Sequence, residues 1–290
     1  MQQSTIPLSQ LIIGCMRWGL WGAKFNTQQY QETIEWCVNK GLTSFDHADI
    51  YGDYTTEAEF GNALRQMKIQ RESIQLITKC GINMPCNTRP EYQVKAYDTS
   101  AAFIIESAER SLRNLQTEYI DILLIHRPSP LMHPDEIAKA VEYLTTAGKI
   151  KAFGVSNFKP SQVSMLSAIV PPRYNQIEIS LQQLSAFTDG TLDQCIEKQI
   201  QPMAWSPLAG GNLSSNQNLE ALTKKIAAQY ETTEEAIMLS FLAKHPSKII
   251  SVIGTSNKER MKRCLAFKEV TLSNQDFFEL YSTALGHDIP

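Results

Sequence analysis

Short apolar segments alternate with segments of helical periodicity along most of the chain. The apolar segments predict strands at residues 11–15, 43–46, 73–79, 119–125, 150–155, 174–179, 200–205 and 249–253. Apolar residues spaced three and four positions apart predict helices at residues 27–40, 57–67, 98–115, 134–147, 159–169, 192–198, 217–230, 233–244 and 257–267. Strands that alternate with helices form a parallel sheet, and eight such strands close into a (β/α)8 TIM barrel. The pattern therefore predicts the α/β class and this barrel.

One domain is expected over residues 1–290, with 1–10 as an N-terminal lead-in and 268–290 as a C-terminal tail. The connection at 80–97 is longer than most loops, which predicts a functional loop on the rim of the barrel. A doubly wound sheet is the alternative fold, and it usually carries a glycine-rich fingerprint after its first strand. Here Gly14-Cys15-Met16-Arg17-Trp18-Gly19 follows the first strand and does not fit G-x-G-x-x-G.

Composition excludes several classes of protein. The 290 residues are 43% hydrophobic and 20% charged, which supports a folded core. The net charge of −3 indicates neither nucleic acid nor a membrane surface as a partner, and no obligate protein partner is evident. No signal peptide and no transmembrane segment is expected from the apolar pattern. The six cysteines are scattered without a C-x-x-C motif, which predicts reduced thiols in a soluble cytoplasmic protein and no metal site.

Four polar residues stand at or just after the ends of predicted strands. Asp46 ends the second strand and Tyr51 follows it, while Lys79 ends the third strand and His126 follows the fourth. Each has an ordinary explanation when taken alone: a helix cap, a surface tyrosine, a lysine reaching solvent, or a satisfied structural histidine. Active sites of barrels lie at the carboxyl ends of the strands. The four residues together therefore predict a site.

The chemistry of these side chains indicates carbonyl reduction. A phenol beside an ammonium group is a general acid, because the positive charge lowers the pKa of the phenol from about 10. Asp46 is suited to hold Lys79, and the imidazole of His126 can donate a hydrogen bond to a carbonyl oxygen. Tyr51 would then give a proton to that oxygen. Because none of these side chains is a redox group, the hydride must come from a cofactor.

The arrangement Asp46, Tyr51, Lys79 and His126 resembles the catalytic tetrad of the aldo-keto reductases, in the order typical of that family. Segments 45–52, 148–158, 205–208 and 253–256 resemble further motifs of the family, so that the resemblance extends over about residues 10–265. Segments 14–17 and 45–52 are most similar to the bacterial YdhF-type members. The resemblance implies a barrel enzyme that uses NADP(H) to reduce the carbonyl group of a small aldehyde or ketone.

The resemblance also implies which residues bind the cofactor. Ser156, Asn157 and Gln176 would hold the nicotinamide carboxamide, and Trp205 would stack on the nicotinamide ring. Ser206 and Leu208 would line the pyrophosphate, and Gly14, Cys15 and Met16 would lie near the cofactor. The residues implied at the adenosine 2′-phosphate are Gly254, Thr255, Ser256 and Arg260.

The adenosine end departs from the family pattern. Many members have a lysine at the position of Gly254 and a Glu-Asn pair at the positions of Arg263 and Cys264. The basic residues nearby still favour a 2′-phosphate and hence NADP, with solvated helix residues as the alternative. These basic residues are Lys258, Arg260, Lys262 and Arg263.

Substrate choice is expected to come from the loops of the rim. Trp18, Trp21 and Phe25 suggest an apolar wall of the substrate pocket, with simple packing as the alternative. Two other functions stay open: an NADP-binding regulatory module with little turnover, and a barrel aldolase or isomerase that uses Lys79 as a Schiff base.

Overall fold

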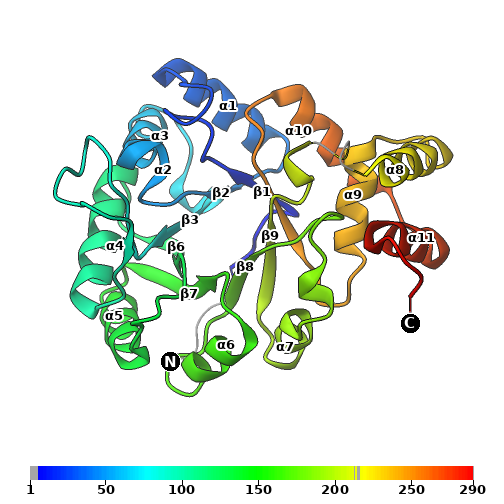
Figure 1. Ribbon diagram of the computed structural model, residues 1–290. Coiled ribbons are helices and arrows are strands. Elements are labelled where there is room, and N and C mark those ends of the chain that lie inside the picture. The colour runs from blue at the N-terminus through cyan, green and yellow to red at the C-terminus, as the bar shows by residue number, and fades with distance from the viewer. Residues whose placement is uncertain (1–5, 212, 214–215, 290) are drawn as a thin grey trace. The chain divides into compact units, whose positions relative to one another are not determined.

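The computed structural model describes residues 6–211, 213 and 216–289. Its main strands form a closed parallel barrel in the order β1-β10-β9-β8-β7-β6-β3-β2, with helices between them (Figure 1). The predicted (β/α)8 barrel is confirmed. The chain divides after Gln176 into two compact units, each described separately below. One domain over residues 1–290 stays a prediction, and residues 1–5 of the expected lead-in lie outside the described residues.

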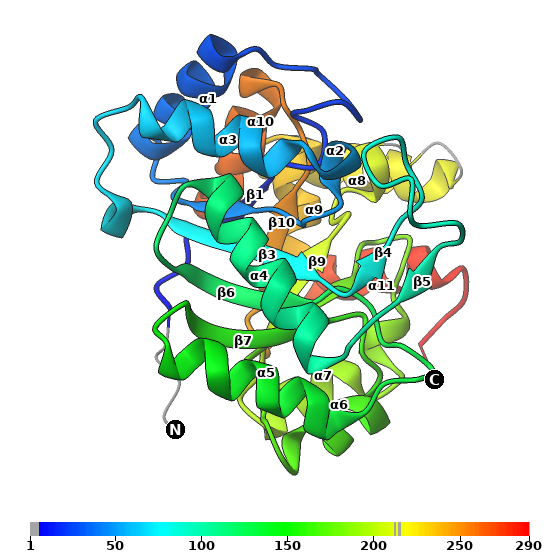
Figure 2. The same cartoon turned by 90° about the vertical axis from the view of Figure 1, so that its left-hand side faces the viewer.

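The first unit contains most of the predicted strands. They pair in parallel and are β1 (Leu11–Gly14), β2 (Ser44–Asp46), β3 (Gln75–Cys80), β6 (Ile120–Ile125), β7 (Ile150–Ser156) and β8 (Tyr174–Glu178), whose last two residues belong to the second unit. Its longer helices are α1 (Thr27–Asn39), α3 (Thr56–Arg65), α4 (Ala101–Leu115), α5 (Pro134–Thr146) and α6 (Pro160–Ser167). Figure 2 shows α4 and α5 running along β6 and β7. Every residue of β3 and β6 is buried, and β6 is accordingly apolar apart from Asp121, whereas β3 also buries Gln75, Thr78 and Lys79.

Three elements of the structure differ from the expected ones. The loop after Asp46 contains a short helical turn, α2 (Tyr51–Tyr54). The long connection at 80–97 is not irregular throughout, because β4 (Ile82–Asn83) pairs with β5 (Ala96–Tyr97) in an antiparallel hairpin. The C-terminal segment expected to be a tail contains a helix, α11 (Asn274–Leu285).

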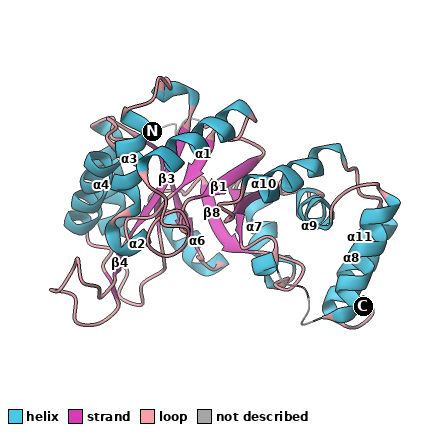
Figure 3. Cartoon of the chain, turned by 90° about the horizontal axis from the view of Figure 1, so that it is seen from above, coloured by secondary structure: helices cyan, strands magenta, loops and turns pink. Residues whose placement is uncertain are grey.

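The second unit is mainly helical. Its strands β9 (Gln201–Trp205) and β10 (Ile250–Ile253) pair in parallel. Its helices are α7 (Thr191–Glu197), α8 (Gln217–Gln229), α9 (Glu234–Ala243), α10 (Lys258–Leu265) and α11. Figure 3 shows α8, α9 and α11 together, and the rings of Phe241 and Phe277 stack with centroids 4.6 Å apart between α9 and α11. Because this packing buries apolar side chains of all three helices, α11 is part of the core of the unit. Among the described helices, none is both long enough and apolar enough to cross a bilayer.

Candidate active site

Parallel pairing brings the ends of three strands to one place in the first unit. Strand β2 pairs with β3, and β3 pairs with β6. Asp46 ends β2, Lys79 is the second-last residue of β3, and His126 directly follows β6. The backbone N–H of His126 donates to the carbonyl oxygen of Cys80 at 2.8 Å, which extends the pairing to the histidine. Three of the four predicted site residues therefore start from adjacent strand ends, and the fourth, Tyr51, begins the turn α2 (Tyr51–Tyr54).

Lys79 is the centre of the site. Its Nζ donates to both carboxylate oxygens of Asp46, at 2.8 and 2.7 Å, and to the carbonyl oxygen of His47 at 2.7 Å. It also donates to the hydroxyl of Tyr51 at 3.1 Å. Lys79 is 1% exposed and Asp46 is 3% exposed, so the ion pair is almost dry.

The charge on Lys79 survives its burial. Burial acts to lower the pKa of Lys79, but Asp46 and Tyr51 raise it more, and the net pKa lies above its ordinary value. A Schiff-base lysine attacks a carbonyl as the neutral amine. The cationic state of Lys79 therefore argues against the aldolase or isomerase alternative.

Tyr51 is buried with its hydroxyl beside Lys79. No described residue accepts the phenol proton, so this proton is available to a substrate oxygen. Burial raises the pKa of Tyr51 above its ordinary value, while Lys79 acts to lower it. The expected effect of the lysine is present, but the expected net lowering is wrong because desolvation of the phenolate outweighs it. The phenol consequently stays protonated.

His126 packs against the ring of Tyr51. The two rings are 6.1 Å apart between centroids and nearly perpendicular, at 80°. Burial lowers the pKa of His126 well below its ordinary value, with further lowering by Lys79, Arg127 and Lys95. The imidazole is therefore neutral, and a neutral imidazole carries one N–H that can be donated.

Gln176 has a contact that the sequence did not predict. Its Nε2 donates to Oδ1 of Asp46 at 2.9 Å, and the side chain is buried. Two residues expected in different roles, cofactor binding and catalysis, are thus directly linked. The carbonyl of His47, which accepts from Lys79, was also missed, because a backbone acceptor leaves no mark in residue types.

The other cofactor residues implied in the first unit surround this link. Nδ2 of Asn157 donates to Oγ of the buried Ser156 at 2.7 Å, and Asn157 adopts a left-handed backbone at φ 58°. The backbone N–H of Cys15 donates to the carbonyl oxygen of Asp46 at 2.9 Å. Gly14 and Cys15 are buried, whereas Met16 is exposed. The hydroxyl and amide groups of this set match the donors and acceptors of a carboxamide.

The second unit holds Trp205, which is implied at the nicotinamide ring, and the residues implied at the phosphates. Trp205 ends β9 and is half-buried, Leu208 is also half-buried, and Ser206 is exposed. Gly254 is exposed, and a Cβ added there would meet no atom within 4 Å. Thr255 and Ser256 lead into α10, which begins at Lys258, and Arg260 is exposed in its first turn. Open backbone and basic side chains at a helix N-terminus fit a phosphate group.

The three aromatic residues expected in the substrate pocket are placed differently. Trp18 is completely buried and its ring lies 5.7 Å from that of Tyr30, which favours packing, so its place in the substrate pocket stays a prediction. Phe25 is half-buried and packs on Trp18 at 5.8 Å. Trp21 remains a candidate, because its ring lies 6.0 Å from that of Tyr51.

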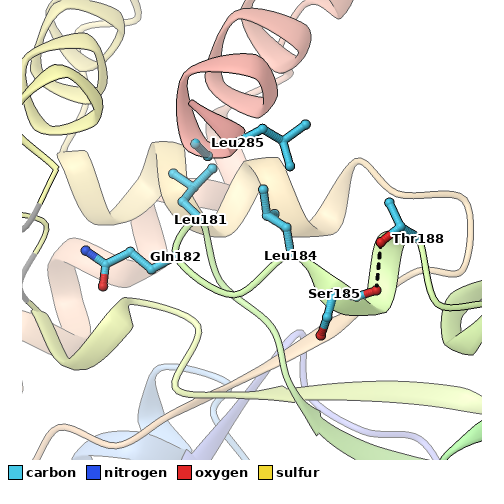
Figure 4. A pocket seen from close by; sticks show the side chains of 7 residues that line it. Leu181, Gln182, Leu184, Ser185, Thr188 and Leu285 are labelled. Carbon is cyan, nitrogen blue, oxygen red and sulfur yellow. Dashed lines mark hydrogen bonds between the residues drawn. The ribbon is translucent and has the colours of Figure 1, made fainter. Parts of the chain in front are cut away.

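A separate pocket of ≈ 300 Å³ lies in the second unit (Figure 4). None of the expected site residues lines it. Its lining residues are Leu181, Gln182, Leu184, Ser185, Thr188, Ala284 and Leu285.

The barrel and the tetrad define a class of protein. The model of the Aldo/keto reductase family matches residues 10–284. The chain therefore belongs to the aldo/keto reductase family, which confirms the resemblance, and as a member it is an NADP-dependent oxidoreductase.

Particular relatives support this assignment over nearly the whole chain. A 6-dehydroglucose reductase from Agrobacterium fabrum is 41% identical over 288 residues, which cover 98% of this chain and 97% of that protein. Oxidoreductase YdhF from Escherichia coli is 38% identical over 279 residues, which cover 94% of this chain and 93% of that protein. The expected similarity to YdhF-type members is confirmed. The crystal structure of an aldo/keto reductase from Klebsiella pneumoniae, in complex with NADP and acetate, has a TM-score of 0.79 at 24% identity and covers 94% of this chain and 90% of that chain. It supports the fold.

Proposed function

We propose that this protein uses NADPH to reduce the carbonyl group of a small aldehyde or ketone to an alcohol, with Tyr51 as the general acid. The observation that carries the proposal is the contact of the Tyr51 hydroxyl with Lys79 at 3.1 Å. In that contact the phenol oxygen accepts a hydrogen bond and keeps its own proton to give. The family assignment supports the reaction class.

The proposed contacts with NADPH begin at its nicotinamide end. Ser156, Asn157 and Oε1 of Gln176 would bind the carboxamide, and Trp205 would face the nicotinamide ring. When bound, NADPH supplies the hydride. The phosphate contacts that we propose are Ser206, Leu208, Gly254, Thr255, Ser256 and Arg260. Gly14, Cys15 and Met16 complete the proposed set beside Asp46.

The four side chains of the tetrad would together transfer one proton to the carbonyl oxygen. His126 would donate a hydrogen bond to the carbonyl oxygen and orient it toward Tyr51. As negative charge develops on that oxygen, Tyr51 would give it the phenol proton. Lys79 would stabilise the resulting phenolate, and Asp46 would keep Lys79 in place and charged. The overall result is an alcohol and a tyrosinate, which solvent reprotonates.

The setting of the reaction is also part of the proposal. All six cysteines are free thiols, which is typical of a reducing compartment such as the cytoplasm. The substrate is proposed to be a small molecule, as for other enzymes of this reaction class. A relative that is named a 6-dehydroglucose reductase makes 6-dehydroglucose a suitable member of any substrate panel.

The test is the substitution Tyr51→Phe, which removes only the phenol hydroxyl. We expect the kcat for NADPH oxidation to fall by ~10²–10⁴-fold, the usual effect of losing a general acid. NADPH affinity, measured by quenching of tryptophan fluorescence, should not change. Full activity of Tyr51→Phe would overturn the role of Tyr51. NADPH binding by the unaltered protein without oxidation across a panel of aldehydes and ketones would instead favour a regulatory module.

A further inference from the structure

The backbone directly after Tyr51 adopts an unusual conformation. Gly52, Asp53 and Tyr54 all have positive φ values, at 60°, 55° and 67°. Glycine adopts this left-handed conformation freely, but in other residues the Cβ collides with the backbone. Two consecutive residues with side chains in this region need surroundings that impose it. The structure therefore has to hold this turn in place.

The β4–β5 hairpin holds the turn through the side chain of Tyr54. The Tyr54 hydroxyl donates to the carbonyl oxygen of Ile82 at 3.2 Å and accepts from the backbone N–H of Met84 at 3.0 Å. The guanidinium of Arg89 lies over the Tyr54 ring, 4.8 Å from its centroid. Burial raises the pKa of Tyr54 to about 12, so that the hydroxyl keeps the proton that it donates. One phenol thus uses both its donor and its acceptor on the hairpin.

Asp53 is also held by two hydrogen bonds. The Oγ1 of Thr88, which lies between β4 and β5, donates to the backbone carbonyl oxygen of Asp53 at 2.6 Å. The indole Nε1 of Trp21 donates to Oδ1 of Asp53 at 2.8 Å. Tyr51 and Tyr54 belong to one apolar cluster with Ile82, so the hairpin and the catalytic segment share a core. Both strained residues are therefore anchored to other segments.

We propose that Tyr54 is a positioning residue that ties the turn after Tyr51 to the β4–β5 hairpin and thereby keeps the Tyr51 hydroxyl against Lys79. The proposal rests on the proposed role of Tyr51 as general acid. The connection at 80–97 would then have a second function besides any contact with substrate, because it would keep the Tyr51 hydroxyl in position.

The physical reason is that Tyr54→Phe would leave two backbone groups of the hairpin without a hydrogen-bond partner. The Ile82 carbonyl and the Met84 N–H would both lose their partner, and the turn would lose its link to the hairpin. Relief of the left-handed conformation would then let Tyr51 depart from its position 3.1 Å from Lys79. Small displacements of a reacting group are costly, by up to ~10²-fold in rate for ~1 Å.

The experiment compares Tyr54→Phe with the unaltered full-length protein. We expect kcat to fall by ~10- to 100-fold, while KM for the carbonyl substrate and the affinity for NADPH change little. The kinetic isotope effect with NADPH deuterated at the transferred hydrogen should rise, because the chemical step becomes slower relative to cofactor release. A residue with a merely structural role would lower thermal stability without raising the isotope effect.

Tyr174→Phe is the matched control. Tyr174 is also buried, and its hydroxyl accepts a hydrogen bond from the backbone N–H of Ile6 at 3.4 Å, away from Tyr51. Both variants lose a buried phenol hydroxyl, but only Tyr54→Phe should lose kcat. Thr88 is exposed on the hairpin, and Thr88→Val removes the hydrogen bond from its Oγ1 to the backbone carbonyl oxygen of Asp53. This variant should also lower kcat. It also decides the question if Tyr54→Phe fails to fold.

The outcomes separate this proposal from the one on which it rests. If Tyr51→Phe is inactive while Tyr54→Phe and Thr88→Val keep the original kcat and isotope effect, positioning by Tyr54 is wrong and the general acid stands. If Tyr51→Phe keeps full activity, the general acid itself is wrong. Equal losses of kcat in Tyr54→Phe and Tyr174→Phe would also overturn the positioning role.

Discussion

At the scale of single residues, the proposed acid depends on two opposing effects at Tyr51. Burial destabilises the phenolate, and the cation of Lys79 stabilises it, with burial the larger effect in the free protein. The phenol therefore holds its proton until negative charge develops nearby. Asp46 makes this possible because it compensates the charge of Lys79 in a nearly dry environment. The carboxylate also acts on Tyr51 directly, because its negative charge raises the pKa of the phenol.

Lys79→Met should separate stability from activity. It leaves the carboxylate of Asp46 buried without its cation, and breaking a buried pair in this way costs ~3–5 kcal/mol of unfolding free energy. The double variant Asp46→Asn with Lys79→Met removes the uncompensated charge and should recover most of that loss. Both variants should stay nearly inactive, since Tyr51 has lost its ammonium. Urea unfolding and NADPH oxidation measure the two effects, and equal stability of the single and double variants would contradict the argument.

That Asp46, Lys79 and His126 lie close together could be predicted because their residue types are conspicuous. A carboxylate, an ammonium and an imidazole at the ends of buried strands have no packing role, and parallel pairing brings those ends together. The net pKa of Tyr51 could not be predicted, because the degree of burial is a property of the folded site. The bond from Gln176 to Asp46 was missed for a related reason: it joins residues 130 positions apart.

At the scale of elements, periodicity identified the long helices and the barrel strands but not the short pieces. The turn α2 and the two-residue strands β4 and β5 are too short to show a period, and they owe their shape to contacts such as those of Tyr54. Helix α11 did carry a signal: Ser273 caps it by accepting from the N–H of Asp276. A Ser followed three residues later by an acidic residue is a helix start.

At the crossing of α3 and α4, replacing a glycine with alanine should lower the unfolding free energy, although helix propensity alone predicts an increase. Replacing a helical glycine with alanine usually stabilises a protein by about 0.5–1 kcal/mol. A Cβ on Gly61, however, would clash with the backbone oxygen of Asn114 and would lie 2.7 Å from the backbone carbon of Leu115. Because backbone cannot move aside cheaply, Gly61→Ala should destabilise the protein by ~1–3 kcal/mol.

Chemical denaturation of Gly61→Ala measures this effect. Gly254→Ala is the control, since a Cβ there meets no atom within 4 Å and its φ is not in the left-handed region. Its unfolding free energy should stay within about 0.5 kcal/mol of the original. A more stable Gly61→Ala variant would mean that the two helices are not in close contact at this point.

At the scale of the whole molecule, the site makes folding stability depend on pH. His47 is completely buried, with both ring nitrogens lacking a hydrogen-bond partner among the described residues. Burial, with a further contribution from Lys79, lowers its pKa to about 3. Between that value and the ordinary value near 6.5, the unfolded chain binds a proton that the folded chain does not. Stability therefore falls as the pH falls through this window.

Comparing His47→Phe with the original protein measures how much His47 contributes to the pH dependence of the unfolding free energy. The loss from His47 should amount to ~1.4 kcal/mol of unfolding free energy per pH unit below about 6.5. Buried Asp49 and Glu57 have raised pKa values and act in the opposite direction, but they are present in both proteins and cancel in the comparison. His47→Phe keeps a ring against Phe60, which lies 4.5 Å from the imidazole. Urea unfolding at pH 6.5 and 4.5 should show the original protein losing about 2.3 kcal/mol more than the variant, because the unfolded histidine is already half protonated at pH 6.5. Equal losses would mean that the pKa of His47 is not lowered in the folded protein.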